Sequence, residues 1–138
     1  MTPEKDAELC TKYSKIFKNR NMTELETPIT QGLECDDGWF DLVSVLCHNI
    51  QSHVDWKSST LSSEELASLQ PVIDQVKEKF GGLRFYVTGG DETIEGMIRM
   101  AESMSYKLCE RCGNKGNLRS GDWIRTSCDS CDVQQRRR

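Results

Sequence analysis

The chain has 138 residues with a formal net charge of −4 at pH 7, and 36% of them are hydrophobic and 29% charged. This composition allows one domain with a thin core. It excludes a membrane-spanning helix, because the longest largely apolar stretch, residues 39–47, falls short of the roughly 20 residues that such a helix needs. Residues 1–106 carry 18 acidic and 10 basic side chains (−8), and residues 107–138 carry 4 and 8 (+4), which is a weak charge pattern for a nucleic-acid-binding protein.

The first half of the chain predicts two helices separated by an irregular connection. Thr-Pro-Glu at residues 2–4 is a typical helix start, with a capping hydroxyl, an early proline and an early acid, so we expect a helix from here to Phe17. Residues 18–35 show no periodicity, as in a loop. Asp36 opens a second helix, whose apolar stripe consists of Trp39, Leu42, Val43, Leu46, Ile50 and Val54.

The second half predicts a third helix, a strand and a fourth helix. The third helix starts after Ser62 and ends at Gly81, and Pro71 either breaks or restarts it. Its apolar positions are Leu66, Leu69, Val72, Ile73 and Val76. Residues 83–88 alternate between apolar and polar, which predicts a half-buried strand, and Asp91 caps the fourth helix. We therefore predict an α+β fold, with a body at residues 1–106 in which three or four helices surround one or two short strands.

Two pairs of cysteines predict a metal site in the C-terminal segment. They have the spacing C-x₂-C-x₁₅-C-x₂-C, in which each tight turn presents two sulfurs to one ion. The four ligands would be Cys109, Cys112, Cys128 and Cys131. Because all four are thiols, we expect a structural Zn²⁺ ion, with free dithiols or an iron–sulfur centre as alternatives. The odd number of seven cysteines argues against a disulfide framework.

Residues 107–138 are predicted to form a module around this ion, similar to zinc ribbons and treble clefs, with a basic tail at the C-terminus. Residues 118–119 and 123–125 would pair as a short hairpin with its turn at 120–122. The second cysteine pair would lie at the start of a terminal helical turn, and the strand at residues 83–88 would extend the hairpin's sheet. The remaining thiols are expected to be buried and free: Cys10, Cys35 and Cys47.

Two sets of side chains are candidate binding residues. A protein partner would contact exposed aromatic side chains beside the second helix and the strand, together with a neighbouring arginine. These residues are Trp39, Trp56, Tyr86 and Arg84. The module also resembles DNA-reading zinc fingers that carry Trp-x-Arg ahead of the last cysteine pair. Nucleic acid would then be bound by Arg111, Lys115, Arg119 and Arg125. No catalytic triad can be assembled from the sequence.

Several blocks of the sequence resemble a group of small proteins from bacteriophages and prophages. The likeness covers residues 13–131, and its most specific part is Lys-Glu-Lys-Phe-Gly-Gly-Leu-Arg-Phe-Tyr at residues 77–86. Cys-Asp-Asp-Gly-Trp-Phe at residues 35–40 and both cysteine pairs also recur, whereas Ser14 stands where members often have proline. The resemblance implies a phage setting and supplies no activity or catalytic residues.

These observations favour a binding protein over an enzyme. We expect a non-enzymatic, zinc-stabilised phage accessory protein that binds a bacterial host protein and changes its activity, for example by inhibiting a host defence system. The alternative is a nucleic-acid-binding regulator that uses the arginines of the module. The N-terminal residues lack the pattern of a secretory signal, so we expect the protein in the cytoplasm, which is the host cytosol if a phage encodes it.

Overall fold

The computed structural model describes residues 1–23 and 27–136, which form an α+β fold as predicted. Five α-helices occur in these ranges: α1 (Pro3–Lys12), α2 (Phe40–Ser58), α3 (Ser63–Leu69), α4 (Glu92–Ser105) and α5 (Asp129–Arg136). The strands form two separate antiparallel hairpins, β1 (Val72–Lys79) with β2 (Gly82–Thr88) and β3 (Asn117–Arg119) with β4 (Arg125–Ser127). None of the helices in these ranges is long and apolar enough to cross a membrane.

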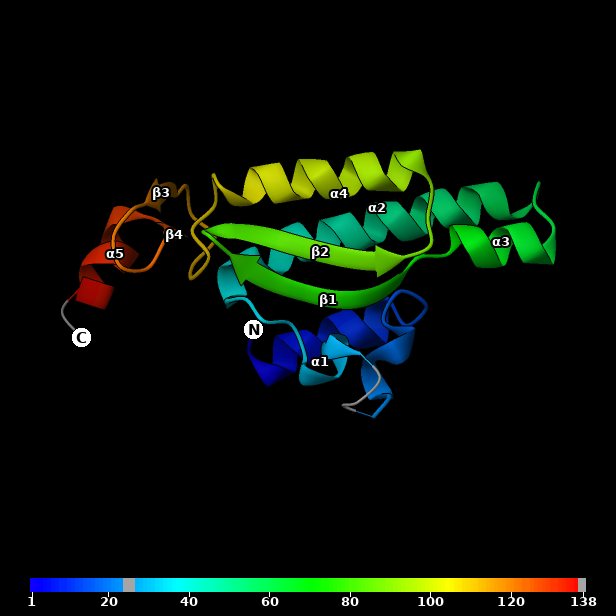
Figure 1. Ribbon diagram of the computed structural model, residues 1–138, viewed down its shortest axis with the longest axis horizontal. Helices are drawn as coiled ribbons and strands as arrows, with labels where there is room; N and C mark the ends of the chain where they lie inside the picture. The colour runs from blue at the N-terminus through cyan, green and yellow to red at the C-terminus, as the bar shows by residue number, and fades with distance from the viewer. Residues whose placement is uncertain (24–26, 137–138) are drawn as a thin grey trace.

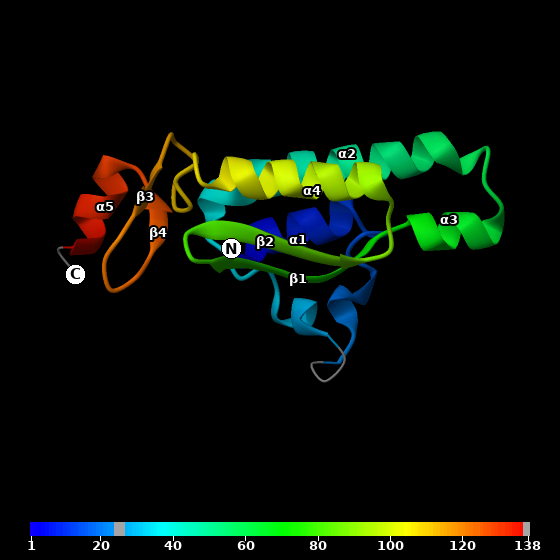
Figure 2. The ribbon, with the colours of Figure 1, turned by 45° about the horizontal axis from the view of Figure 1, so that its top comes forward.

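The β1–β2 hairpin runs through the middle of the body. Figure 1 shows α4 along this hairpin with α2 beside it. Helix α1 lies behind the hairpin in Figure 2, and Tyr13 directly after it contacts Ser44 of α2 at 3.3 Å. The chain after α1 is bonded to β1, because the Ile73 N–H donates to the Ile16 carbonyl and the Glu34 N–H to the Val76 carbonyl, both at 2.9 Å. The β3–β4 hairpin and α5 lie at one end of the long axis and α3 at the other (Figure 2).

The core lies between the β1–β2 hairpin and the surrounding helices. The predicted stripe of α2 is confirmed, since Val43, Leu46, Ile50 and Val54 are all buried. The first helix ends earlier than predicted, because Tyr13 leaves helical geometry with φ −119° and ψ 50°. The predicted irregular connection at residues 18–35 contains two short 3₁₀ helices, Lys18–Asn21 and Pro28–Gln31. Its residues 24–26, like residues 137–138 of the predicted basic tail, lie outside the described part of the chain.

The prediction of a third helix reaching Gly81 is wrong, because residues 72–79 form strand β1. Helix α3 ends at Leu69, two residues before Pro71, whose ring disfavours helical geometry in the preceding residue. The misleading signal was the spacing of three between Ile73 and Val76. In an ideal strand, side chains three residues apart point to opposite faces. Here a register shift between Ile73 and Gln75 places the side chains of Ile73 and Val76 on the same face, in the core.

Phe80 and Gly81 form the two-residue turn between β1 and β2. Both residues have positive φ, 53° for Phe80 and 80° for Gly81, as in the turns whose twist matches that of a β-hairpin. Glu78 supports the turn by accepting a hydrogen bond from the Gly81 N–H at 2.6 Å. Gly81 is therefore part of a hairpin turn and does not end a helix. The turn leaves the side chain of Phe80 64% exposed.

Helix α4 begins at a cap that also ties it to α2. The Asp91 carboxylate accepts a hydrogen bond from the Ile94 N–H at 3.0 Å, as the sequence predicts for a helix N-cap. The same carboxylate contacts His53 Nε2 at 2.8 Å and Lys57 Nζ at 3.2 Å, both on α2. Partial burial raises the pKa of Asp91, but these hydrogen bonds outweigh it and lower the pKa to about 2 from 3.8.

Replacing Asp91 with asparagine is expected to change how stability depends on pH. A carboxylate whose pKa is lowered in the folded state stabilises the protein above its unfolded pKa and loses this contribution as the pH falls towards the folded value. Asparagine caps a helix about as well as aspartate. Asp91→Asn should therefore lower the free energy of unfolding at neutral pH by less than about 1 kcal/mol, because solvent screens the contacts of Asp91 with His53 and Lys57. This loss should shrink as the pH falls from about 5 to about 2.

Urea denaturation at a series of pH values measures this effect. Asp91→Ala serves as a control, because it also removes the cap and should cost about 1 kcal/mol more at every pH. A deficit of Asp91→Asn that stays constant over the acidic range would show that the contacts with His53 and Lys57 add no stability.

Candidate metal centre

The four predicted cysteines converge at the end of the molecule. Their Sγ atoms all lie within 4.8 Å of one another, and this is the only group of three or more candidate metal ligands within residues 1–23 and 27–136. Cys112 Sγ and Cys128 Sγ are 3.7 Å apart. A tetrahedron with metal–sulfur bonds of about 2.3 Å has sulfur–sulfur edges of about 3.8 Å. The cluster is therefore compatible with a structural metal ion.

The first cysteine pair lies on a tight turn after α4. The Gly113 N–H donates to the Cys109 carbonyl at 2.8 Å, and the Cys109 N–H donates to the Asn114 carbonyl at 2.7 Å. Gly113 has φ 77°, a left-handed conformation that favours glycine. These bonds fold the backbone so that Cys109 and Cys112 both place their Sγ atoms in the cluster.

The second cysteine pair lies at the start of α5, as predicted. The Cys131 N–H points at Cys128 Sγ at 3.5 Å, and the Asp132 N–H donates to the Cys128 carbonyl at 3.0 Å. The hydrogen bond from the Cys131 backbone is the main cause that lowers the pKa of Cys128 to about 7. Metal ions bind thiolates rather than thiols, so this helix start favours the ligand form of Cys128.

The module that carries these cysteines is fastened to the body by hydrogen bonds on both sides of the metal centre. Trp39 Nε1 donates to the Leu108 carbonyl at 3.0 Å, and the Gly38 N–H donates to the Glu110 carbonyl at 2.7 Å. Thr126 Oγ1 donates to the Gly81 carbonyl in the β1–β2 turn at 2.6 Å. The prediction that residues 83–88 extend the module's sheet is wrong, because β2 pairs with β1 and the two sheets are separate.

Gly38 makes the tightest contact between body and module. A Cβ atom at this position would lie 2.3 Å from the Cys109 carbonyl oxygen, 2.4 Å from the Glu110 carbonyl oxygen and 2.5 Å from the Gly113 nitrogen. All three atoms belong to the backbone of the first metal-binding turn, so they cannot move without displacing Cys109 and Cys112.

Gly38→Ala is therefore expected to destabilise the protein by about 1–3 kcal/mol, as overpacking does, and to weaken metal binding. Gly96→Ala is the matched control, because a Cβ atom there meets nothing within 4 Å and alanine in a helix should stabilise by about 0.5–1 kcal/mol. Thermal denaturation and metal competition with a chelator measure both effects. Equal metal affinity in Gly38→Ala and the wild type would contradict the expectation.

Two of the four predicted nucleic-acid-binding residues, Arg119 and Arg125, lie opposite each other on β3 and β4, and both are engaged in ion pairs. Arg119 pairs with Asp129, and Arg125 pairs with Asp132 at 2.8 Å. Arg111 is partly buried, and Lys115 is exposed. Two of the four cations are therefore already neutralised by acids of α5, and their guanidinium groups hold the β3–β4 hairpin to that helix.

The predicted partner-binding residues differ in exposure. Trp56 is 76% exposed and Tyr86 is 43% exposed. Arg84 is half-buried and donates to the Leu83 carbonyl at 2.8 Å and to the Tyr106 hydroxyl at 3.1 Å. Trp39 is completely buried, so the prediction that it contacts a partner is corrected: it belongs to the core and holds the module.

The sequence predicts buried free thiols at the three cysteines outside the metal centre, and the structure confirms this for two of them. Cys35 and Cys47 are buried, and Cys10 is partly buried. Burial raises the pKa of Cys10 and of Cys35 to about 12, and it also raises the pKa of Cys47. These thiols therefore stay protonated at neutral pH, which makes them poor nucleophiles and poor metal ligands.

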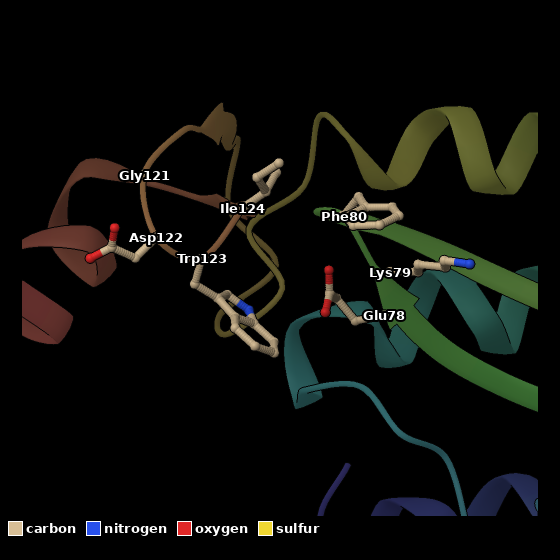
Figure 3. A pocket seen from close by; sticks show the side chains of 7 residues that line it. All are labelled: Glu78, Lys79, Phe80, Gly121, Asp122, Trp123 and Ile124. Carbon is tan, nitrogen blue, oxygen red and sulfur yellow. The ribbon is translucent and has the colours of Figure 1, made fainter.

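A cleft between the body and the module was not predicted from the sequence. We call it the Phe80–Trp123 cleft: a cavity of about 440 Å³ lined by residues 78–80 of the hairpin and residues 121–124 of the β3–β4 loop. Figure 3 shows Phe80 and Glu78 on one side of the gap and Trp123 and Ile124 on the other, with Lys79 directed away along the hairpin. Trp123 is 69% exposed, which leaves aromatic side chains on both sides open to solvent.

A second cavity of about 620 Å³ adjoins this cleft through Glu78 and Trp123. We call it the acidic groove, because four carboxylates line it: Glu34, Asp36, Glu78 and Glu110. Burial raises the pKa of Glu110 to about 7, opposed by the hydrogen bond from the Asp36 N–H and assisted by the charges of Asp36 and Glu78. The sequence pattern did not indicate this surface, because it assigned Phe80 to the end of a helix and Trp123 to a hairpin strand.

Comparison with known proteins assigns this chain to no family. No protein-family model matches the sequence, no curated protein matches it, and no solved structure matches it. The likeness to small phage proteins therefore stays a prediction from the sequence. What the protein does must be inferred from the metal centre and from the surface around it.

Proposed function

We propose that this protein is a zinc-stabilised binding protein whose partner is another protein. Four thiol sulfurs in a tetrahedral arrangement suit Zn²⁺. The set supplies all four ligands, so the ion would hold the module in shape and leave no coordination position for a substrate. Zinc in such sites contributes about 10–16 kcal/mol of apparent binding free energy, which is more than hairpin β3–β4 and helix α5 could gain by packing.

The observation that carries a protein-binding role is the exposure of large aromatic side chains around a fixed cavity. Phe80 and Trp123 are 64% and 69% exposed and line the same cleft. Tryptophan is enriched among the few residues that dominate binding in protein–protein interfaces, and phenylalanine is enriched in the core of such interfaces. In a phage setting the partner would be a bacterial host protein in the cytoplasm, and binding would modulate that protein, for example by inhibiting a defence system.

The alternative role, a regulator that binds nucleic acid, has less support. Arg119 and Arg125 pair with Asp129 and Asp132, and carboxylates line the groove beside the module. Phosphate binding needs free cations on one face. A nucleic acid would therefore have to displace two ion pairs and approach an acidic surface.

Affinity purification from bacteria that express the tagged protein, followed by mass spectrometry, tests the proposed role. We expect one bacterial protein in stoichiometric amount, and we expect the purified pair to associate in isothermal titration calorimetry. A gel-shift series at low salt tests the alternative, because phosphate contacts weaken steeply as salt rises. Salt-sensitive nucleic-acid binding without any bound protein would overturn the proposal.

A further inference from the structure

We propose that the Phe80–Trp123 cleft and the acidic groove together bind one segment of a partner protein, in which an apolar side chain is flanked by lysine or arginine. The apolar side chain would enter the cleft, and the basic side chains would lie along the groove. This inference rests on the proposed protein-binding function and adds the surface and the chemistry of the partner. Glu78 and Trp123 line both cavities, so a single extended segment could fill the two.

The cleft has the size and lining of a site for an apolar side chain. Its volume of about 440 Å³ falls within the range of roughly 300–1,000 Å³ that is usual for binding pockets. Phe80 stands on one side, and Trp123 and Ile124 on the other. Covering these exposed side chains would remove apolar surface from water, which is worth about 25 cal/mol per Å².

The two sides of the cleft are held at a fixed separation before any partner binds. Thr126 Oγ1 donates to the Gly81 carbonyl at 2.6 Å, which ties strand β4 to the turn that carries Phe80. Leu118 Cδ1 packs so closely on Gly81 that a Cβ atom there would lie 2.3 Å from it. The metal centre holds both ends of the β3–β4 hairpin. A preorganised site loses less entropy on binding, so these contacts favour recognition.

The charge of the groove selects the flanking residues. Leaving out Glu110, whose pKa is raised to about 7, three carboxylates line the groove. Among the described residues of its lining, one unpaired positive charge faces them, the Met1 amino group, because Arg125 is paired with Asp132. The groove is therefore acidic, as is the body as a whole. Lysine and arginine complement this charge, whereas an acidic segment or a phosphate backbone is repelled.

Binding of synthetic peptides tests the inference by fluorescence anisotropy with the zinc-loaded full chain. The probe is a fluorescein-labelled peptide with one tryptophan between two pairs of lysines in a glycine–serine context. We expect micromolar binding, and a loss of about tenfold or more when alanine replaces the tryptophan of the peptide. A peptide with glutamates in place of the lysines should not bind. Failure of the lysine peptide to bind, or equal binding of the glutamate peptide, would overturn the inference.

Two pairs of protein variants locate the site. Trp123→Ala should weaken the lysine peptide about tenfold or more, and Trp56→Ala should not, because Trp56 lies on α2 outside both cavities. Glu34→Lys should weaken it, and Glu64→Lys on α3, with the same change in net charge, should have a smaller effect. Unchanged binding in both Trp123→Ala and Glu34→Lys, with metal content retained, would overturn the assignment of this surface.

The same variants distinguish this inference from the proposed function. A bacterial partner that copurifies equally with the wild type and with Trp123→Ala would leave the protein-binding role intact and remove this surface from it. If instead the wild type binds a labelled DNA duplex at low salt, and Glu34→Lys tightens this binding more than Glu64→Lys does, the groove faces nucleic acid, and the inference is wrong. The inference is supported if the bacterial partner is lost with Trp123→Ala but not with Trp56→Ala, and if the lysine peptide binds.

Discussion

Replacing Cys109 with serine is expected to reduce the bound metal from one ion per chain to none and to unfold the C-terminal module. Cys109 is the fully buried member of the four ligands, and a hydroxyl cannot replace its thiolate. Residues 107–136 contain only two three-residue strands and one eight-residue helix, so they cannot offset the loss of a metal whose binding contributes about 10–16 kcal/mol in comparable modules. Elemental analysis measures the metal content.

Amide hydrogen exchange of Cys109→Ser should show that the damage is local. We expect the amides of β3, β4 and α5 to lose protection, while those of α2 and α4 keep most of theirs because the core of the body needs no metal. Cys10→Ser is the matched control, since Cys10 lies outside the cluster and hydroxyl can keep the hydrogen bond to Asp6. A chelator should reproduce the effect in the wild type, and stoichiometric Zn²⁺ should reverse it. A Cys109→Ser variant that still binds one ion per chain would contradict the assignment of the ligands.

Trp39→Ala is expected to destabilise the body by about 3–5 kcal/mol, the usual cost of removing a buried tryptophan. Trp39 is completely buried, and its indole N–H donates to the Leu108 carbonyl directly before the first metal ligand. The loss is a large fraction of the roughly 5–15 kcal/mol that stabilise a typical domain. Trp39→Ala also removes the hydrogen bond to the Leu108 carbonyl, which holds the backbone directly before Cys109. We therefore also expect the metal to exchange faster.

Trp56→Ala provides the comparison for this prediction. The two tryptophans lie at opposite extremes of exposure, and Trp56 is 76% exposed, so its replacement should change the unfolding free energy by no more than about 0.5 kcal/mol. Urea denaturation gives both values, and release of Zn²⁺ to a coloured chelator gives the exchange rate. Equal costs for the two substitutions would show that Trp39 does not pack as the structure places it.

Local patterns in the sequence predicted the elements whose determinants lie close together in the chain. The two C-x₂-C pairs predicted the four candidate ligands, whose Sγ atoms do cluster, because ligand spacing is a local property of a turn. The stripe of α2 and the cap at Asp91 were equally local, and the structure confirms both. The prediction for residues 72–79 was wrong because the register shift after Ile73 produces, within a strand, the spacing of a helix.

The sequence by itself therefore determined the cluster of four cysteines, most of the helices and the acidic charge of the body, since each depends on neighbouring residues or on composition. Only the tertiary structure decided which aromatic residues are buried. It placed Trp39 in the core beneath the module and left Phe80 and Trp123 on the surface. It also brought the turn at Phe80 against the loop at Trp123, because the hydrogen bond from Thr126 to Gly81 joins segments far apart in the chain. No local pattern encodes such a contact, which depends on how the folded body and the β3–β4 hairpin pack together.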